Sequence, residues 1–403
     1  MKKGRKLLSM TGRFVFIVSL FFSVYVFAMF QGGKVSWTIF YMLTPFLLYS
    51  IALFVYPMNN IKAERIIHTR AIERGGKLSV TVKISRTVPF PLLYAGASEK
   101  WEDPEMAIKA NNRTKHLFIF GFKKEVEWSY EIEKLPRGEH IVKGIEVEVS
   151  DFFGWIQKRA FLELKDTILV YPTTTPMKYV PINAQYDRGS LVSPFSLVKD
   201  TTMATGVRDY QSGDRVTWIH WKSFARTQNL MTKEFEDRQS EDLVVVLDNR
   251  ASETFEEQVE LAASIVEEAA SHQANIGFIS VGAETAVFPF IHSADQLHDV
   301  FVHLAKVKQV PAEEVLPLEV SSFTGGAGSV VLVTGNPDWP FIQSVMGFVK
   351  NRKSVICFIV VNREEPISDR LYEQIKFAEA KGITVHMLGK MQFSEAFKEV
   401  ASL

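Results

Sequence analysis

The sequence predicts a multi-domain membrane protein with a two-helix transmembrane hairpin, an all-β immunoglobulin-like sandwich and a C-terminal α/β doubly wound domain. Two uncharged apolar runs lie within the first 61 of its 403 residues. Short alternating and β-branched segments follow, and apolar strands then alternate with helical periodicities up to the C-terminus. These changes divide the chain into a hairpin at 1–61, a β-sandwich at 62–172, a linker at 173–242 and the α/β domain at 243–403.

The transmembrane prediction depends on the length of the two apolar runs. Phe14–Phe30 carries no charge, and a second uncharged run extends from Val35 to Ile61. A spanning helix needs about 20 apolar residues, so we expect spans at roughly 14–31 and 36–56 in contact with a lipid bilayer. A signal peptide is the alternative, but the first run lacks a small-x-small cleavage site and a second span follows it.

Basic residues around the two runs predict the orientation. Five cations precede the first run, one lies in the turn and three follow the second run: Lys2, Lys3, Arg5, Lys6 and Arg13; Lys34; Lys62, Arg65 and Arg70. Cytoplasmic flanks of membrane helices carry an excess of Lys and Arg. We therefore expect a protein of the cell membrane whose N-terminus and soluble domains face the cytoplasm.

The sandwich prediction comes from several short strand-like segments within about 110 residues, separated by turn residues. They are the segments 78–86, 116–122, 125–134, 140–150 and 166–172. The tetrapeptide Asp151–Gly154 superficially resembles a kinase motif, but it has one residue too many and no catalytic loop precedes it. We interpret it as a turn at the end of a strand.

The α/β prediction rests on a change of periodicity after residue 243. Strands are expected at 243–248, 275–281, 285–290, 329–335, 354–361 and 383–389, with helices at 255–272, 295–307, 340–351, 368–381 and after the last strand. Gly282–Glu284 is typical of a hairpin, which places the strand at 285–290 on an edge. The remaining alternation favours a mostly parallel sheet.

The linker holds an unusual concentration of charged and aromatic residues. Gln211–Asp214 is a turn signal, and Asp214 is well placed to cap a helix predicted over residues 215–226. Trp218 and Trp221 share one face of that helix at i, i+3 spacing.

Three interpretations of the linker stay open. The Trp pair and the charges either lock the helix against a domain core, or they form a docking surface for an acidic partner or anion. In the docking reading the basic residues are Arg208, Arg215, Lys222 and Arg226, with Trp221 as the apolar anchor. Catalysis through Asp214 and His220 is the third interpretation, although no activated nucleophile accompanies them.

At these residues the chain resembles the bacterial "domain of unknown function 58" family. The signature residues are Arg208, Tyr210, Gly213, Asp214, Ile219, His220, Trp221, Ala225, Arg226, Glu234, Phe235 and Asp248. Many members carry Asp where this chain has His220. Members are commonly encoded beside MoxR-type AAA+ ATPases and transglutaminase-like membrane proteins, so the resemblance implies an ATPase of that class as the protein partner.

The C-terminal domain looks like a von Willebrand factor A domain. That family binds a divalent metal through Asp-x-Ser-x-Ser after the first strand and a later Asp in Thr-Asp-Gly. Here Arg250 replaces one Ser, and Gly335 stands in the later Asp position. Asp248 and Ser252 are therefore expected to be vestigial metal positions, and Arg250 could pair with Asp248 and take the electrostatic place of the cation.

Composition and the remaining motifs exclude other classes. Lys+Arg and Asp+Glu each number 46, which argues against nucleic-acid binding. The run Gly325–Gly328 precedes a strand instead of opening a helix, so it is not a phosphate loop, and Cys357 is expected to be a buried thiol. The leading hypothesis is a non-enzymatic adaptor without a cofactor; the alternatives are an enzyme of unknown class using Asp214 and His220, or a metal-dependent adhesion module.

Overall fold

The computed structural model describes residues 2–69, 71–110, 113–178, 204–211, 216–235, 242–272, 274–311, 329–336, 338–339, 341–343, 354–362 and 369–397. The chain forms two compact units, Met1–Pro172 and Thr173–Leu403. The predicted glycine loop at 325–328 and most of the helix predicted at 340–351 lie outside the described residues.

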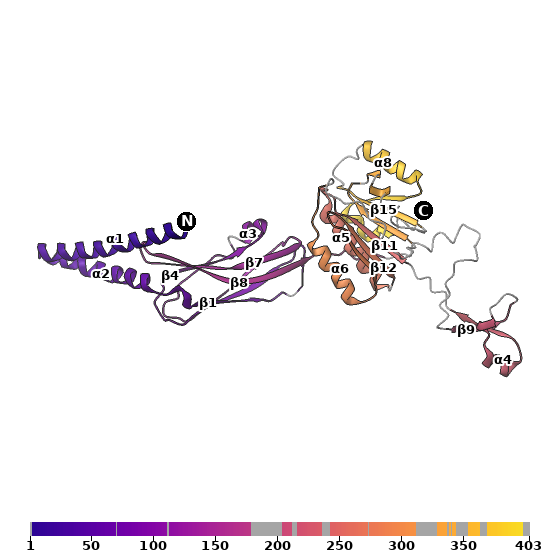
Figure 1. Cartoon of the computed structure of the whole chain (residues 1–403), viewed down its shortest axis with the longest axis horizontal. Helices are drawn as coiled ribbons and strands as arrows, with labels where there is room; N and C mark the ends of the chain where they lie inside the picture. The colour runs from indigo at the N-terminus through magenta and orange to yellow at the C-terminus, as the bar shows by residue number, and fades with distance from the viewer. Residues whose placement is uncertain are drawn as a thin grey trace. The chain divides into compact units, whose positions relative to one another are not determined.

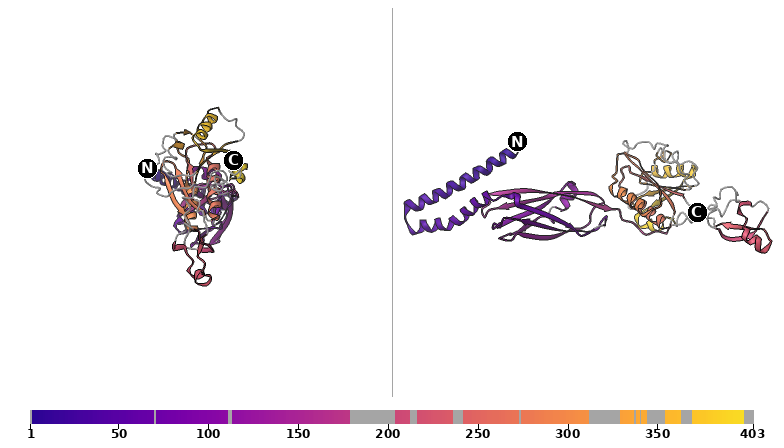
Figure 2. Two further views of the ribbon diagram at one scale, coloured as in Figure 1. Left: turned by 90° about the vertical axis from the view of Figure 1, so that its right-hand side faces the viewer. Right: turned by 60° about the horizontal axis from the view of Figure 1, so that its bottom comes forward.

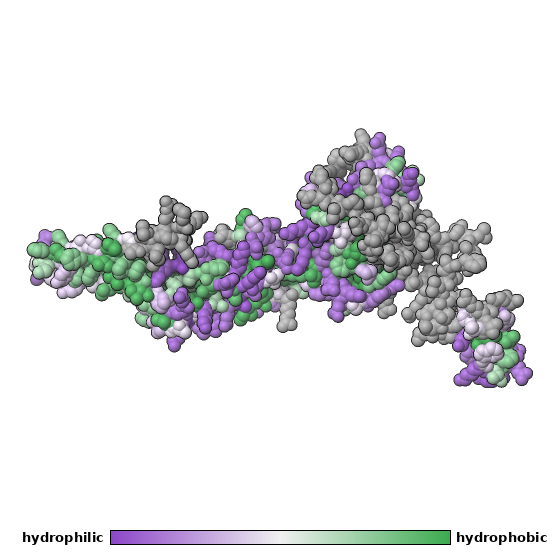
Figure 3. All heavy atoms as spheres, in the orientation of Figure 1, coloured by the Kyte–Doolittle hydropathy of each residue, from purple (hydrophilic) through white to green (hydrophobic). Residues whose placement is uncertain are grey.

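Two long apolar helices open the first unit. They are α1 (Lys2–Gln31) and α2 (Lys34–Val55), which lie side by side (Figure 2). The stretches long and apolar enough to cross a membrane are Gly12–Gln31 and Lys34–Val55. At 1.5 Å per residue, 20 to 22 residues reach about 30 Å, the thickness of the hydrocarbon core of a bilayer. Hydrophobic residues dominate the surface of this hairpin (Figure 3).

The strands of the first unit form two sheets. The three-stranded antiparallel sheet has the order β1-β3-β6, with β1 (Ile61–Ile67), β3 (Leu78–Arg86) and β6 (Glu125–Ile132). The five-stranded sheet has the order β2-β8-β7-β4-β5, with β2 (Ile72–Glu73), β8 (Gln157–Tyr171), β7 (Gly138–Ser150), β4 (Tyr94–Trp101) and β5 (His116–Phe118). A short 3-10 turn, η1 (Met58–Asn60), and helix α3 (Pro104–Ala110) complete the unit.

Alternation along the strands creates one core between these sheets. Val80 and Val82 of β3 are fully buried in the same apolar cluster as Val147 and Val149 of β7. The strand predicted at 166–172 is the end of the longer β8, and the one predicted at 116–122 is only three residues long. The immunoglobulin-like label remains a prediction.

The helical hairpin shares this core and is tied to it by polar contacts. Ile17, Leu47 and Leu53 belong to the same apolar cluster as the strands. Ser50 of α2 donates a 2.6 Å hydrogen bond to Asp151 after β7. Lys158 of β8 donates to the carbonyl oxygens of Phe54 at 2.9 Å, of Leu53 and of Tyr56. They belong to the last turn of α2 and the residue after it, so the ammonium group caps the C-terminal end of the helix.

A buried ionic network crosses the interior of the first unit. Arg65 donates from Nε to Glu99 Oε1 at 2.7 Å and from Nη1 to the Leu164 carbonyl at 3.0 Å and to Asp166. Tyr130 donates its hydroxyl proton to Glu99. Burial would lower the pKa of Arg65, but the carboxylates of Glu99 and Asp166 outweigh it and raise that pKa. Arg65 therefore stays charged inside the domain.

The second unit contains a six-stranded sheet in the order β13-β12-β11-β14-β15-β16. Its strands are β11 (Asp242–Asp248), β12 (Asn275–Val281), β13 (Ala286–Ile291), β14 (Ser329–Thr334), β15 (Ser354–Val360) and β16 (Thr384–Leu388). Neighbouring strands are parallel except at β13, which lies on the edge and runs antiparallel to β12, as predicted. A parallel sheet requires crossover connections, which explains the helices between the strands.

Helices cover both faces of this sheet (Figure 1). They are α5 (Phe255–Ser271), α6 (Ala294–Lys306) and α8 (Asp369–Ala380), followed by the 3-10 turn η6 (Lys390–Glu395). Val245 belongs to the cluster formed with α5, whereas Val244 belongs to the cluster formed with α8. Strands buried on both faces need continuous apolar runs, which is the pattern of the sequence. The closing helix predicted after the last strand begins instead as η6.

The Arg65 network gives a stability prediction. Glu99→Gln removes the negative charge beside a fully buried guanidinium, so we expect the free energy of unfolding to fall by about 3 kcal/mol. Lys100→Gln is the matched control, because Lys100 lies next in β4 and its ion pair with Glu146 is 47% and 33% exposed. Urea denaturation of the detergent-solubilised chain measures both losses. Equal losses would contradict the structural role of the buried network.

Candidate functional site

The residues of the linker signature fold into a small β-hairpin. Strands β9 (Ala204–Asp209) and β10 (Met231–Phe235) pair antiparallel, with η4 (Val216–Trp218) and α4 (Trp221–Thr227) between them. Arg208 lies opposite Thr232, and the Tyr210 amide donates to the Leu230 carbonyl at 3.0 Å. Gly213, Asp214 and Arg215 lie outside the described residues, as does the side chain of Glu234.

The single helix predicted over residues 215–226 is wrong. Ile219 forms a bridge with Thr232, and the His220 amide donates to the Met231 carbonyl at 2.8 Å. These backbone bonds to β10 interrupt the helix, so the chain makes one 3-10 turn and starts again at Trp221. Trp218 and Trp221 therefore belong to different elements and do not share a helix face.

His220 is the N-cap of the second helix. Its Nδ1 accepts a hydrogen bond from the Ser223 amide at 3.2 Å and lies 2.7 Å from Ser223 Oγ. Asp, Asn, Ser and Thr are the usual caps because an oxygen acceptor meets the first unpaired amides. An imidazole nitrogen performs the same task here, so His220 retains the acceptor that an Asp would supply. The sequence signal was the placement of His220 three residues before Ser223.

Helix α4 presents its aromatic and basic side chains to solvent. Trp221 is 59% exposed, and its ring meets that of Phe224 edge-on at 6.1 Å. Lys222 and Arg226, one turn apart, are also exposed. An exposed Trp beside two cations matches the composition of interface anchors.

A second cluster lies where β11 and β14 end. The Asp248 carboxylate accepts from the Arg250 amide and Nε at 3.0 Å each through Oδ1. Its Oδ2 accepts from Arg250 Nη2 at 2.8 Å and from Thr334 Oγ1 at 2.6 Å. Asp248 and Arg250 are 1% and 7% exposed. The suggested pairing of Arg250 with Asp248 is therefore present.

Arg250 makes further contacts beyond this ion pair. Its Nη1 donates to Asp338 at 2.6 Å, its Nη2 donates to the Asn336 carbonyl at 2.6 Å, and the guanidinium stacks 4.2 Å above the Phe341 ring. Burial would lower the pKa of Arg250, but Asp248 and Asp338 outweigh it and raise that pKa. The permanently charged Arg250 thus joins the end of β11 to residues 336–338 and to Phe341.

The surrounding residues do not fit a divalent cation of the von Willebrand type. Ser252 Oγ accepts a hydrogen bond from Gln258. A Cβ at Gly335 would lie 2.3 Å from Gln258 Nε2, 2.7 Å from Ser252 Oγ and 2.9 Å from Thr254 Oγ1. A side chain at Gly335 would require these three side chains to shift, and the Asp248 oxygens already accept hydrogen bonds from Arg250 and Thr334. Hard cations require several oxygen ligands, which this arrangement does not offer.

Cys357 lies on β15 of the same sheet, between β14 and β16. Its side chain is fully buried on β15, and burial, assisted by Asp248, raises the pKa of the thiol to about 12. The thiolate is the reactive form of cysteine, and it is scarce at neutral pH under these conditions. Cys357 is therefore a core residue, as the sequence predicted.

Comparison with known proteins identifies a family that this chain matches. Residues 206–367 match the family described as "Protein of unknown function DUF58". The uncharacterized protein YeaD of Bacillus subtilis (strain 168) is 37% identical over 298 residues, which are 73% of this chain and 74% of that protein.

Two solved structures share weaker similarity. A von Willebrand factor type A protein from Catenulispora acidiphila is 14% identical, with a TM-score of 0.27 and 43% of each chain covered. A conjugative transposon lipoprotein from Bacteroides eggerthii is 12% identical, with a TM-score of 0.18, and covers 27% of this chain and 96% of its own.

The Asp248–Arg250 pair gives a second prediction. Asp248→Ala and Arg250→Ala should each lower the free energy of unfolding by about 3–5 kcal/mol, because each leaves a buried charge unpaired. The double variant should lose at least about 1 kcal/mol less than the sum. The rate of Cys357 modification in rising urea measures opening of this unit alone. Additive losses would show that the two side chains act independently.

Divalent cations provide the third prediction. Calorimetric titration of the full chain with Mg²⁺ or Mn²⁺ should show no stoichiometric binding, because Arg250 occupies the Asp248 carboxylate. A clean micromolar isotherm that disappears in Asp248→Ala would overturn this assignment. Tryptophan fluorescence of the variant would verify that it is still folded.

Proposed function

The chain belongs to the DUF58 family, and from this premise we propose that it is a membrane-anchored adaptor that binds other proteins and performs no chemistry itself. The proposal places α1 and α2 in the cell membrane and both soluble parts in the cytoplasm. In it, the two sheets of the first unit form an immunoglobulin-like spacer. The parallel sheet of the second unit is a doubly wound domain of the von Willebrand factor A type.

One observation carries the proposal: the exposed aromatic and basic surface of α4. Trp221 offers a large apolar side chain, and Lys222 and Arg226 flank it with positive charge. Interface energy concentrates on Trp and Arg side chains of this kind. Backbone pairing to β10 and the His220 cap hold the short helix in place. A preorganised anchor lowers the entropic cost of binding.

The enzyme alternative has less support. It requires His220 and Asp214 to act together as proton-transfer groups. The Nδ1 of His220 is engaged by Ser223 at the helix end. The edge of the sheet, where ligands bind in many α/β domains, is filled by Arg250.

The proposed partner is an AAA+ ATPase of the MoxR type, a class implied by family resemblance. Its surface would be acidic where it meets α4, since Lys222 and Arg226 are cationic. In the cytoplasmic orientation such an ATPase has direct access to α4. Assembly or remodelling at the cell envelope is the process this pairing would serve.

Photocrosslinking in cells tests the partner. A photoreactive phenylalanine in place of Trp221 should capture an AAA+ ATPase, and Arg226→Glu in the same chain should reduce the yield about tenfold, a loss of one interfacial charge contact. The same probe at Tyr372 of α8 is the control, because Tyr372 is a similarly exposed aromatic residue at 54%. If no ATPase is found among the crosslinked proteins, with or without added ATP, the proposed pairing with an ATPase is wrong.

A further inference from the structure

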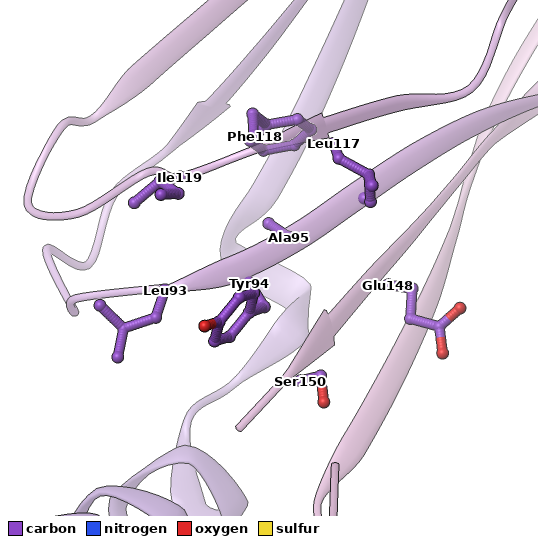
Figure 4. Close-up of a pocket in the computed structure, with 9 residues that line it drawn as sticks. Leu93, Tyr94, Ala95, Leu117, Phe118, Ile119, Glu148 and Ser150 are labelled. Carbon is purple, nitrogen blue, oxygen red and sulfur yellow. The ribbon is translucent and has the colours of Figure 1, made fainter. Parts of the chain in front are cut away.

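The β-domain of the first unit carries a hydrophobic groove beside α2. The groove has a volume of about 680 Å³ and lies on the outer face of the five-stranded sheet. Its lining residues are Leu93, Tyr94, Ala95, Gly96, Leu117, Phe118, Ile119, Glu148 and Ser150 (Figure 4). This volume falls within the range of pockets that hold small organic ligands, about 300–1,000 Å³.

The groove exposes an unusual amount of apolar surface. Leu117 is 87% exposed, Ile119 is 67% exposed and Tyr94 is 50% exposed. The hollow exists because Gly96 has no side chain; a Cβ there would lie 3.2 Å from Leu117 Cδ2. Strand β5 is at the edge of its sheet, so within the described residues it pairs with a strand on one side only. Grouped exposed apolar side chains mark contact sites for lipid or protein.

Two contacts join the groove to α2. The Leu93 amide donates to Tyr49 Oη at 3.2 Å. The Tyr94 ring meets Phe152 at 6.1 Å, and Phe152 meets Phe46 of α2 at 5.1 Å. Residues that line the groove therefore contact α2 directly, through Tyr49, or through the Phe152 ring.

The position of these contacts along the axis of α2 indicates what kind of ligand the groove binds. Phe46 lies nine residues before the last residue of α2, which is about 13 Å along the helix axis. The turn after β7 reaches this level with two aromatic side chains, Phe152 and Phe153, which are 51% and 43% exposed. If α2 spans the bilayer, these rings lie inside it, and the Tyr94 end of the groove lies next to them.

We propose that the groove binds the acyl chain of a phospholipid from the same membrane. This inference rests on the membrane anchoring in the proposed function. The chain would lie against Leu117, Ile119 and Tyr94, where it removes the exposed apolar surface of the groove from water. The polar Ser150 and Tyr94 hydroxyl groups lie along the groove, where the glycerol region of the lipid would be.

Photolabelling of the full chain in phospholipid vesicles tests the proposal. The probe is a trace phospholipid with a diazirine on its acyl chain, and labelled peptides are mapped by mass spectrometry. We expect labels on α1, on α2 and on the groove segments 93–96 and 117–119. Leu117→Glu and Ile119→Glu should each reduce groove labelling about tenfold, since a carboxylate opposes an apolar chain. Both side chains are exposed, so the fold should persist.

Ile108→Glu is the matched control. Ile108 is 79% exposed on α3 and lies outside the groove, so this variant should keep wild-type groove labelling. Labelled helices with unlabelled groove segments would overturn the lipid site alone. Unlabelled helices would overturn the membrane anchoring itself.

The competing occupant is a second copy of the chain paired along β5. Leu117→Cys places a thiol on that edge, and the one native cysteine, Cys357, is buried. Efficient disulfide dimerisation through the introduced thiol in vesicles would show that a second copy covers the groove, and it would overturn the lipid proposal. A monomer whose introduced thiol is shielded from water-soluble thiol reagents by the vesicles supports it.

Discussion

The second unit depends on one ion pair, between Asp248 and Arg250 at the end of the first parallel strand. A carboxylate buried at 1% exposure must be compensated, and parallel sheets commonly recruit ligands at this edge. Here the compensating positive charge comes from the chain itself, from Arg250 two residues after Asp248. The guanidinium also reaches Asp338 and the Asn336 carbonyl after β14. Groups of the chain itself therefore hold this end of the sheet together.

In the first unit, a buried basic side chain likewise connects the helices to the β-domain. Carbonyl groups of the last turn of α2 and of the residue after it accept hydrogen bonds from Lys158, about a hundred residues later. Burial lowers the pKa of Lys158, because it disfavours the charged ammonium group. The hydrogen bonds to these carbonyl oxygens stabilise that charge. Ser50 and Asp151 add a buried bond one turn earlier. These polar contacts thus set the position at which the helical hairpin packs against the strands of the first unit.

Local patterns predicted most elements, whereas long-range contacts explain the failures. Strands such as 275–281 carry their own β-branched run, and their bounds agree with the prediction. Strand β4 contains Ala and Gly, which have weak strand preferences, so its pairing with β7 and β5 decides that it is a strand. The break at Ile219 has the same origin, since its cause is a backbone bridge to Thr232. Lys158 and Arg65 could not be assigned partners because those partners are distant in sequence.

The rigid attachment of α2 has a mechanical consequence. Helices in a bilayer adjust their tilt when their apolar length differs from the local hydrocarbon thickness. The β-domain is clamped to the end of α2 by Lys158 and by the aromatic turn, and both belong to the same compact unit as the helices. With the proposed membrane anchoring, a change in tilt would therefore rotate the β-domain together with α2, and bilayer thickness would set the angle at which the β-domain projects.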